Sequence, residues 1–200
     1  MEGVYVGRNS VMLGDRTCRP ITTRDGKILV PVQITPLGPD GTPVTMLRVE
    51  GFDTQVTYRT GELKKLLSRI GPARIETDPA TVAQSWAWVR DAALFRGTNE
   101  DVWRISVKPT DGVRVTDALP GASLLMDWGG GLVWAGVAPG TDVRAALVGI
   151  PGHATLVRAA PETVHALGAF HPEPAPVAAI AKGLRQKFDP RGILNPGLVG

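Results

Sequence analysis

Cysteine and histidine are scarce in this sequence. Cys18 is the only cysteine in 200 residues, and there are 3 histidines. One thiol cannot form an internal disulfide, and no cluster of thiolates exists to hold zinc or an iron–sulfur centre. Because no histidine stands near Cys18 to activate it, we expect a structural thiol. We predict no metal ligands in the chain.

Long apolar runs and an excess of charge of one sign are also missing. The longest uncharged apolar stretches, 121–126 and 129–140, are short and rich in glycine, so neither predicts a membrane-spanning helix. Residues 1–8 lack the basic run and long apolar segment of a secretory signal, so we expect a cytoplasmic location. The formal net charge of +3 suits an anionic small molecule as well as nucleic acid.

What the sequence does contain predicts one well-buried core. Hydrophobic residues make up 43% of the chain, and the mean hydropathy is close to zero. Turn residues at 24–27 and 39–41 precede extended runs at 28–34 and 44–50, which predicts two hairpins. The second run alternates in the manner of a strand with one face in the core.

Two helices are predicted after these strands. Asp53 can cap a helix that continues to Ile70, and a second helix begins at Pro79. The apolar face of the second helix includes Trp86 and Trp88, at the spacing of a helix that packs on a sheet. We expect these tryptophans to lie in the core.

The middle of the chain alternates strands with turns and a short helix. The run 102–108 is a half-buried strand by its alternation, and a loop of about fifteen residues follows it. Gly129–Gly131 predict a hairpin turn between two flanking strands. A short helix starts at Thr141, and a strand follows at His153–Arg158. This order predicts an α+β fold, an antiparallel sheet with helices on one face, as in ferredoxin-like proteins.

The C-terminal segment predicts a helix that ends in a stiff hook. The helix carries an apolar stripe and must end by Asp189, because Pro190 follows. Two turns come next, at Asp189–Gly192 and Asn195–Gly197. Such a hook can present the Asn195 amide to a polar ligand edge, such as that of a flavin, or it can clamp the chain end. The residues alone leave both interpretations open.

Several strings of the sequence carry a family resemblance. KFDPRGILNPG (187–197) is similar to the C-terminal signature of FAD-linked oxidases of the vanillyl-alcohol oxidase and p-cresol methylhydroxylase type. VWRISVKP (102–109), DWGGGLVW (127–134) and GHATLVRAAPE (152–162) resemble, in that order, the FAD-binding subunits of bacterial glycolate oxidases. RVEG (48–51) and the tryptophan-rich helix extend the resemblance toward the N-terminus.

The resemblance covers about residues 44 to 200 and implies three parts. Residues 1–40 are an N-terminal β-hairpin segment, 41–170 the cap domain over flavin and substrate, and 171–200 the terminal helix and flavin-facing hook. The implied function is that of the substrate-side part of an FAD-dependent 2-hydroxyacid oxidase or dehydrogenase of glycolate type. The family's main FAD-binding domain has no counterpart here, so FAD and turnover would depend on that domain or on other oxidase subunits. We expect the isolated chain to be inactive.

The implied chemistry requires a group that holds a carboxylate and a group that accepts the hydroxyl proton, roles that suit arginine and histidine. Arg158 is the candidate carboxylate clamp, Arg104 is the alternative, and His153 is the candidate base. Both His153 and Arg104 also have an interpretation without a catalytic role. His153 would then be a hydrogen-bonded edge or core histidine, and Arg104 would lie on a solvated strand face. His153 and Arg158 share a site only if a bulge intervenes, because five positions apart on a regular strand they project to opposite faces. The residues implied at the flavin are Asn195, Pro196 and Gly197.

Two other functions fit parts of the sequence. A non-catalytic assembly module would keep the cap fold and pack against oxidase subunits. An RNA-binding sheet would need paired exposed aromatic residues on its strands, which the pattern does not predict. We therefore expect a small anionic substrate and no nucleic-acid partner.

Overall fold

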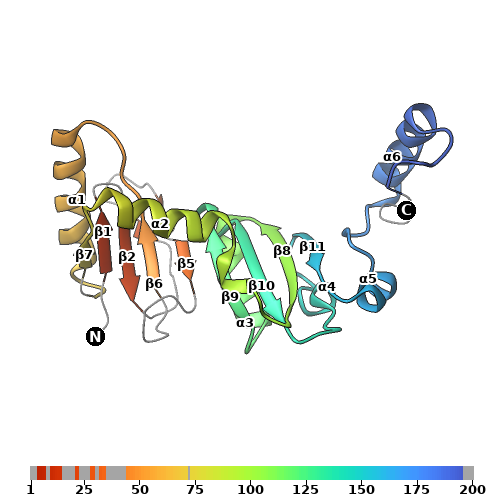
Figure 1. The fold of residues 1–200 in the computed structure, drawn as a ribbon, viewed down its shortest axis with the longest axis horizontal. Helices are drawn as coiled ribbons and strands as arrows, with labels where there is room; N and C mark the ends of the chain where they lie inside the picture. Colours follow the sequence, from red (N-terminus) through yellow and green to blue (C-terminus); the bar gives the residue numbers. More distant parts are fainter. Residues whose placement is uncertain are drawn as a thin grey trace.

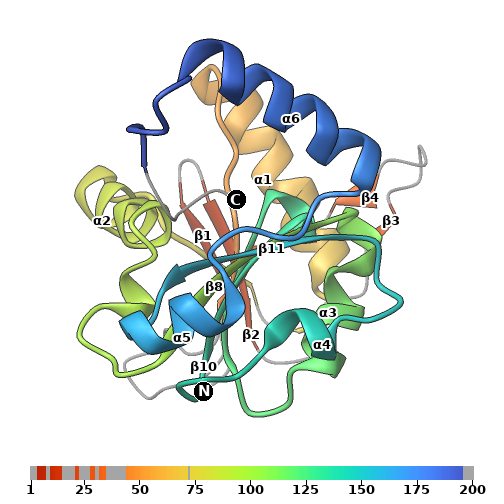
Figure 2. The same cartoon turned by 90° about the vertical axis from the view of Figure 1, so that its right-hand side faces the viewer.

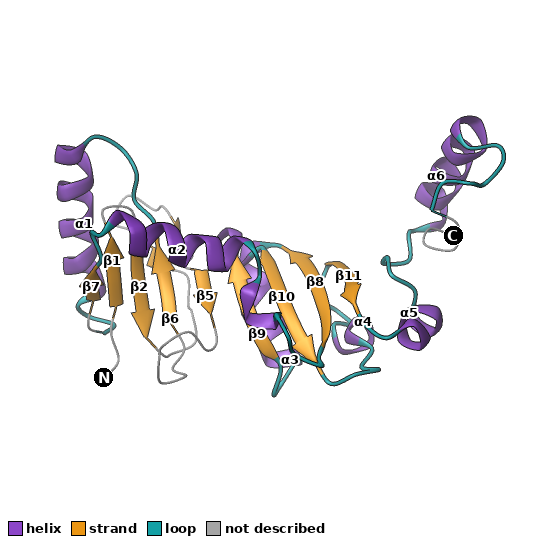
Figure 3. Cartoon of the chain, viewed as in Figure 1, coloured by secondary structure: helices purple, strands orange, loops and turns teal. Residues whose placement is uncertain are grey.

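The computed structural model describes residues 4–7, 10–14, 21–22, 28–29, 32–34, 44–71 and 73–195. Cys18, the expected turns at 24–27 and 39–41, and the pair Pro196-Gly197 lie outside the described residues. Figures 1 and 3 show an elongated arrangement, with one twisted sheet crossing the molecule and helix α6 set apart at one end.

The described residues form a mixed set of strands and helices. The strands are β1 Val4–Gly7, β2 Ser10–Gly14, β3 Ile21–Thr22, β4 Ile28–Leu29, β5 Val32–Ile34, β6 Val44–Leu47, β7 Ala73–Ile75, β8 Asp101–Val107, β9 Ser123–Asp127, β10 Leu132–Val137 and β11 Gly152–Arg158. The helices are α1 Asp53–Leu67, α2 Pro79–Arg90, α3 Gly112–Ala118, α4 Val143–Ala146, α5 Pro161–Leu167 and α6 Ala175–Phe188. The short 3-10 turns are η1 Ala93–Phe95, η2 Pro109–Asp111 and η3 Trp128–Gly130.

Four strands in the second half of the chain form an antiparallel sheet with the order β9-β10-β8-β11. The chain visits them as β8, α3, β9, β10, α4 and β11, which is a β-α-β-β-α-β path with β8 and β10 in the centre. The predicted α+β fold with a ferredoxin-like arrangement is therefore confirmed for this part of the chain.

One face of this four-stranded sheet is fully covered. Trp103, Ile105 and Val133 lie on it without exposed surface, beneath α3, α4 and α5. Val115 of α3 and Val143 of α4 are also completely buried in the same cluster. Figure 2 shows these three helices together on one side of the sheet. Burial of side chains of this size contributes about 1.5–3 kcal/mol each, so this cluster is the main source of stability here.

The first half of the chain extends the same sheet past β9. The order continues as β5, β6, β2, β7 and β1, and Ile34 of β5 pairs with Leu125 of β9 at the junction. The antiparallel pairings β3–β4 and β5–β6 agree with the two predicted hairpins. Strand β7 was not predicted, and it lies parallel to β1. The division into three parts stays a prediction.

Helix α2 begins as its sequence predicts, whereas α1 differs. The Asp78 carboxylate accepts hydrogen bonds from the Thr81 amide, at 2.8 Å, and from the Thr81 hydroxyl, at 2.6 Å, which caps α2. Asp53 is not the cap of α1. It is the first helical residue, after Phe52, and Ile70 lies beyond the end of the helix with 58% of its surface exposed.

Two further expectations are corrected by burial. The segment after β8 is not a loop of coil but contains α3, because Val115 gains complete burial there and this outweighs the weak helix propensity of a segment rich in valine and glycine. Strand β6 is buried on both faces, not on one face as its alternation predicted. Thr45 and Met46 are both buried, because Met46 joins the cluster beneath α2.

Arg144 fastens α5 to the sheet. Its guanidinium donates to the Leu167 carbonyl at 2.7 Å and to the Ala169 carbonyl at 2.9 Å, at the C-terminal end of α5, and stacks 4.8 Å from the Trp103 ring centroid. Burial lowers the pKa of Arg144 below its usual range. The Leu156 amide donates to the Ala169 carbonyl at 2.8 Å, so the chain beyond α5 is held along β11.

Helix α6 packs differently from the other helices. None of its residues is buried, and Val177, Ile180, Leu184 and Phe188 expose between 48% and 76% of their surface. The predicted apolar stripe is present and faces no described element closely enough to be covered. Figures 1 and 2 place α6 beyond β11, on the side of the sheet opposite α3 and α4.

Two helical glycines should respond to alanine in opposite ways. A Cβ on Gly112 would lie 2.5 Å from the Gly130 carbonyl oxygen and 2.8 Å from the Met126 methyl carbon, whereas a Cβ on Gly61 of α1 would meet nothing within 4 Å. Gly112→Ala should lower the free energy of unfolding by about 1–3 kcal/mol through overpacking. Gly61→Ala should raise it by about 0.5–1 kcal/mol. Urea denaturation measures both, and a stabilised Gly112→Ala would contradict this packing of α3 on the β9–β10 turn.

Candidate functional site

The second face of the four-stranded sheet carries the polar and aromatic side chains. Residues directly opposite each other in antiparallel strands project to the same side, so the observed register defines three rows. From β11 to β9 the rows are Arg158, Val102, Gly136 and Ser123; then Thr155, Arg104, Trp134 and Leu125; then His153, Ser106, Leu132 and Asp127. Apolar residues thus fill one face, and the candidate site residues lie together on the other.

A β-bulge puts His153 and Arg158 on the same face. His153 pairs with Ser106 and Arg158 pairs with Val102, and the register shifts between Leu156 and Arg158. Five positions on a regular strand would separate the two side chains onto opposite faces, and the extra residue reverses this. The sequence required a bulge for His153 and Arg158 to share a face, and the structure contains one.

Helix α2 and η1 cover only part of this second face. Phe95 and Val89 pack over Val102 and Leu125, and this cluster closes the region nearest η1. His153 is exposed, whereas Arg104, Ser106 and Thr155 are half-buried. We call the uncovered region around these four residues the open face.

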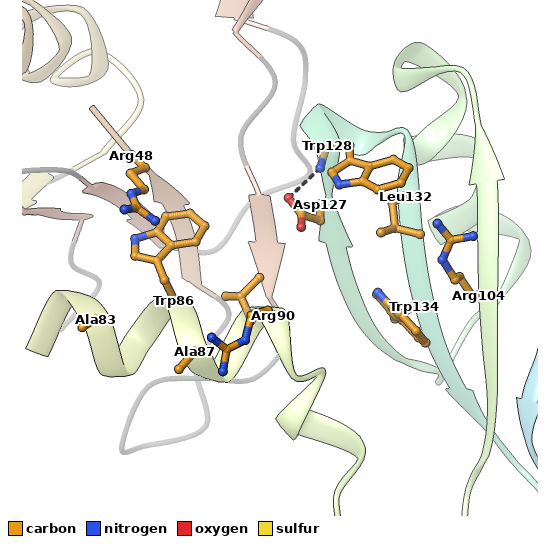
Figure 4. A pocket seen from close by; sticks show the side chains of 11 residues that line it. Arg48, Ala83, Trp86, Ala87, Arg90, Arg104, Asp127, Trp128, Leu132 and Trp134 are labelled. Carbon is orange, nitrogen blue, oxygen red and sulfur yellow. Dashed lines mark hydrogen bonds between the residues drawn. The ribbon is translucent and has the colours of Figure 1, made fainter. Parts of the chain in front are cut away.

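A pocket of about 630 Å³ lies next to the open face, between α2 and the sheet (Figure 4). The sheet contributes Arg104, Trp128 and Trp134, and α2 contributes Trp86 and Arg90 on the opposite wall. The remaining lining residues are Arg48, Ala83, Ala87, Val89, Asp127 and Leu132. The charged lining residues are three arginines and one aspartate, and three tryptophans form aromatic walls. A concave site of this size with aromatic walls is typical of small-molecule binding.

Arg104 is the cation best placed to bind an anion in this pocket. Its guanidinium carbon lies 5.4 Å from the ring centroid of Trp128, and within the described part of the chain it has no hydrogen bond or ion pair. The other arginines of the pocket have acidic partners: Arg48 pairs with Glu50, and the Arg90 Nε lies 2.7 Å from Asp91 Oδ1. Arg104 therefore keeps its in-plane donors for a ligand.

Arg158 is used by the fold. Its guanidinium donates to the Phe95 carbonyl at 2.7 Å, to the Thr98 hydroxyl at 2.8 Å and to the Glu100 carbonyl at 3.0 Å. These bonds hold the segment between η1 and β8 against the end of β11. Both terminal nitrogens of Arg158 thus serve the fold, whereas the Arg104 guanidinium makes no hydrogen bond to a described residue.

His153 lies next to a second histidine. The Ala154 amide donates to His171 Nδ1 at 3.4 Å, so His171 accepts as a neutral imidazole. The pKa of His171 is lowered by burial and by the neighbouring charges of Arg144 and His153. The His153 side chain makes no hydrogen bond to another described residue and is exposed, which leaves it accessible as a base.

The C-terminal hook is built around Asp189. Its carboxylate accepts the Ile193 amide at 3.0 Å and the Leu194 amide at 2.9 Å, and the Gly192 amide donates to the Asp189 carbonyl at 3.0 Å. The first predicted turn is therefore present. Asn195 follows with φ of 48°, in the left-handed region that asparagine tolerates, and its exposed amide has no hydrogen bond to a described residue.

The sequence interpretation missed the aromatic part of the site. It assigned the tryptophans of α2 to the core, and both are half-buried against the cluster of Val89 and Phe95, but Trp86 also lines the pocket. It gave no role to Trp128, which exposes 61% of its surface, or to Trp134. Trp134 alternates with the apolar Val133 and Ala135, so its side chain projects from the other face of the strand, which is the signal that was available.

The comparisons relate this chain to an oxidase subunit. Over 116 residues it is 34% identical to the glycolate oxidase subunit GlcE of Escherichia coli (strain K12). The chain is similar to a glycolate oxidase subunit. The aligned stretch is 57% of this chain, and the chain spans 30% of the length of that relative. No protein-family model and no solved structure matches the chain.

The described residues contain neither a candidate membrane-spanning helix nor a cluster of metal-binding side chains. Among them no helix combines the length and apolar character needed to cross a bilayer. Within the same residues no three side chains from His, Cys, Asp and Glu gather as metal ligands would.

The hook should depend on pH through Asp189. The amides of Leu194 and Ile193 lower the pKa of this carboxyl, so the hook is stabilised above the unfolded pKa of about 3.9 and is lost as pH falls through the lower folded pKa. Amide exchange of Ile193 and Leu194, followed by NMR from about pH 7 to about pH 2, measures this. Asp189→Asn should abolish the pH dependence. Titration of Asp189 at its ordinary pKa would contradict the hook geometry.

Proposed function

We propose that the chain is the substrate-side part of an FAD-dependent 2-hydroxyacid oxidase or dehydrogenase of glycolate type. Most of the flavin would be bound by a domain that these 200 residues do not contain, within the same assembly. The observation that carries the proposal is the free guanidinium of Arg104 on the open face, next to His153, in a chain similar to a glycolate oxidase subunit.

The residues present fit the ring end of a flavin and not its pyrophosphate. The Asn195 amide is exposed and can donate to and accept from a polar ring edge. The glycine turn 129–131 is closed on itself, because the Gly131 amide donates to the Trp128 carbonyl at 3.3 Å and the Val107 amide to the Gly131 carbonyl at 3.0 Å. It offers no cradle for phosphates. Pro196 and Gly197 remain proposed flavin contacts beside Asn195.

The division of roles on the open face follows from the register. Arg104 would bind the substrate carboxylate through two parallel hydrogen bonds. His153 lies diagonally across from Arg104, at the separation of about 7–8 Å expected for such neighbours, and would accept the hydroxyl proton. The flavin, when bound, supplies the acceptor for the hydride. Arg158 would act by holding the 95–100 segment in place.

A second function is favoured by the exposed stripe of α6. A helix with four large apolar side chains at the surface, Val177, Ile180, Leu184 and Phe188, is suited to pack on another protein. A non-catalytic module that assembles with oxidase subunits would use this helix and would need neither Arg104 nor His153. Turnover therefore distinguishes the two functions, and binding alone does not.

The isolated chain is expected to bind FAD weakly or not at all and to reduce no dye with glycolate. Together with the flavin domain it should support 2-hydroxyacid-dependent dye reduction. In that assembly Arg104→Gln should raise KM about 10²-fold or more, because the ligand carboxylate loses a charged partner. Arg69→Gln removes the same charge from an exposed turn after α1 and should change neither constant. A yellow, active preparation of the chain alone would overturn the proposal, and an assembly that binds without turnover would favour the assembly module.

Asn195→Ala tests the hook in the assembled enzyme. Loss of the amide should weaken flavin binding or lower kcat, because a buried polar edge of the ring would lose its partner. Because a φ of 48° disfavours alanine, Asn195→Gly is the matched variant, which removes the same amide without this strain and should give the same loss. Flavin retention and turnover are the readouts. An unchanged flavin content with normal kcat would remove Asn195 from the site.

A further inference from the structure

We infer that the substrate of this site is a 2-hydroxyacid with an aromatic side chain, and that glycolate fits it poorly. The inference rests on the proposed function and deepens it by naming the substrate class. It is carried by the arrangement of polar and aromatic residues across the sheet rows and by the size of the pocket that adjoins them.

The site has a polar end and an aromatic end. Toward β11 the rows carry Thr155, Ser106 and His153, whose side chains make no hydrogen bond to another described residue. Toward β9 the rows carry Trp134, Leu132, Leu125 and Asp127, and Trp128 follows at the turn (Figure 4). One oxygen of Asp127 accepts the Trp128 amide at 2.6 Å, and the other side chains at this end are apolar or aromatic. Arg104 stands between the two ends. A ligand whose carboxylate meets Arg104 therefore places its hydroxyl among the polar groups and its remaining substituent against indole surfaces.

Arg104 is preorganised for this pose. Its guanidinium carbon lies 5.4 Å from the Trp128 ring centroid, which is a cation–π contact. The N–H groups of Arg104 make no hydrogen bond to a described residue, so they remain for a carboxylate. Trp134 is the direct cross-strand neighbour of Arg104, so a group attached next to the bound carboxylate meets its ring.

The pocket is larger than a two-carbon acid requires. Glycolate has no substituent beyond its hydroxymethyl carbon, whereas the pocket holds about 630 Å³ and continues to Trp86 on α2. This volume lies within the range of about 300–1,000 Å³ that accepts drug-sized ligands. Aromatic rings prefer offset or edge-to-face contacts with other rings, which the three pocket tryptophans offer. A phenyl or indolyl side chain fills the space that glycolate leaves empty.

The five tryptophans of the chain make the site directly observable. Each indole N–H gives its own NMR signal. Trp86, Trp128 and Trp134 line the pocket, whereas Trp103 is completely buried on the covered face and Trp88 does not line the pocket. Titration of the isolated chain with 3-phenyllactate should shift the first three signals and leave Trp103 and Trp88 unmoved. The dissociation constant should be about tenfold or more below that of glycolate.

Two variants distinguish the contribution of the ligand carboxylate to binding from that of the ligand ring. Arg104→Gln should weaken 3-phenyllactate about tenfold or more, and the amide of the same acid should bind the parent chain as weakly. Trp128→Leu, at a side chain with 61% exposure, should weaken 3-phenyllactate more than glycolate, because both acids lose the ring that Arg104 contacts and only 3-phenyllactate also loses a ring-to-ring contact. Tyr58→Leu, an exposed aromatic of α1 outside the pocket, is the matched control and should alter neither.

The outcomes distinguish this inference from the proposed function. Glycolate that binds the pocket as tightly as 3-phenyllactate would overturn the substrate class and leave the proposed function intact. Shifts confined to Trp103 or Trp88, or no shift with either acid, would overturn the pocket as the substrate site. Failure of the proposed function appears separately, as absence of 2-hydroxyacid turnover in the assembly with the flavin domain.

Discussion

The site depends on the pairing of β8 with two neighbours at once. All residues of β8 except Val107 have a partner on β10, and all except Asp101 have one on β11, so a single strand sets which side chains share a face. Trp103 and Ile105 face α3 and α4, and Arg104 between them must face the other way. The bulge in β11 is the one irregularity, and it brings Arg158 to the face that already holds His153.

The helices cover one face of the four-stranded sheet completely and the other face only in part, and the uncovered part can bind a ligand. Complete burial beneath α3, α4 and α5 anchors the sheet, and Arg144 locks α5 to it through carbonyl bonds and a stack on Trp103. On the other face α2 covers only one part, and the remainder keeps Arg104 and the indoles within reach of a ligand. Helix α6 lies on this same side (Figures 1 and 2). The open face and helix α6 are both consistent with a chain that packs against another domain.

The sequence predicted most of the sheet and the first turn of the hook but little of the pocket. Alternation along β8, the glycine turn before β10 and the start of α2 at Pro79 are local signals, and each is confirmed. Helix α3 and strand β7 were missed because their formation depends on tertiary contacts such as the burial of Val115.

The sequence predicted which residue types could serve the chemistry. It did not predict which of these residues make structural hydrogen bonds within the fold. Arg158 carries the right chemistry for a carboxylate, yet its bonds to the 95–100 segment come from a loop far away in sequence. In the sequence alone, Trp128 and Trp134 are recognisable only as hydrophobic residues. Only the cross-strand register brings them beside Arg104, and register is a property of pairs of strands.

The most direct test of the open face is a crystal structure of the chain with a bromine-substituted mandelate, located by anomalous scattering. The account predicts the carboxylate at hydrogen-bonding distance from the Arg104 guanidinium and the bromine between Trp128 and Trp134. Bromine elsewhere on the molecule, no bound ligand at saturating concentration, or an Arg104 side chain turned to the α3 and α4 side would contradict it.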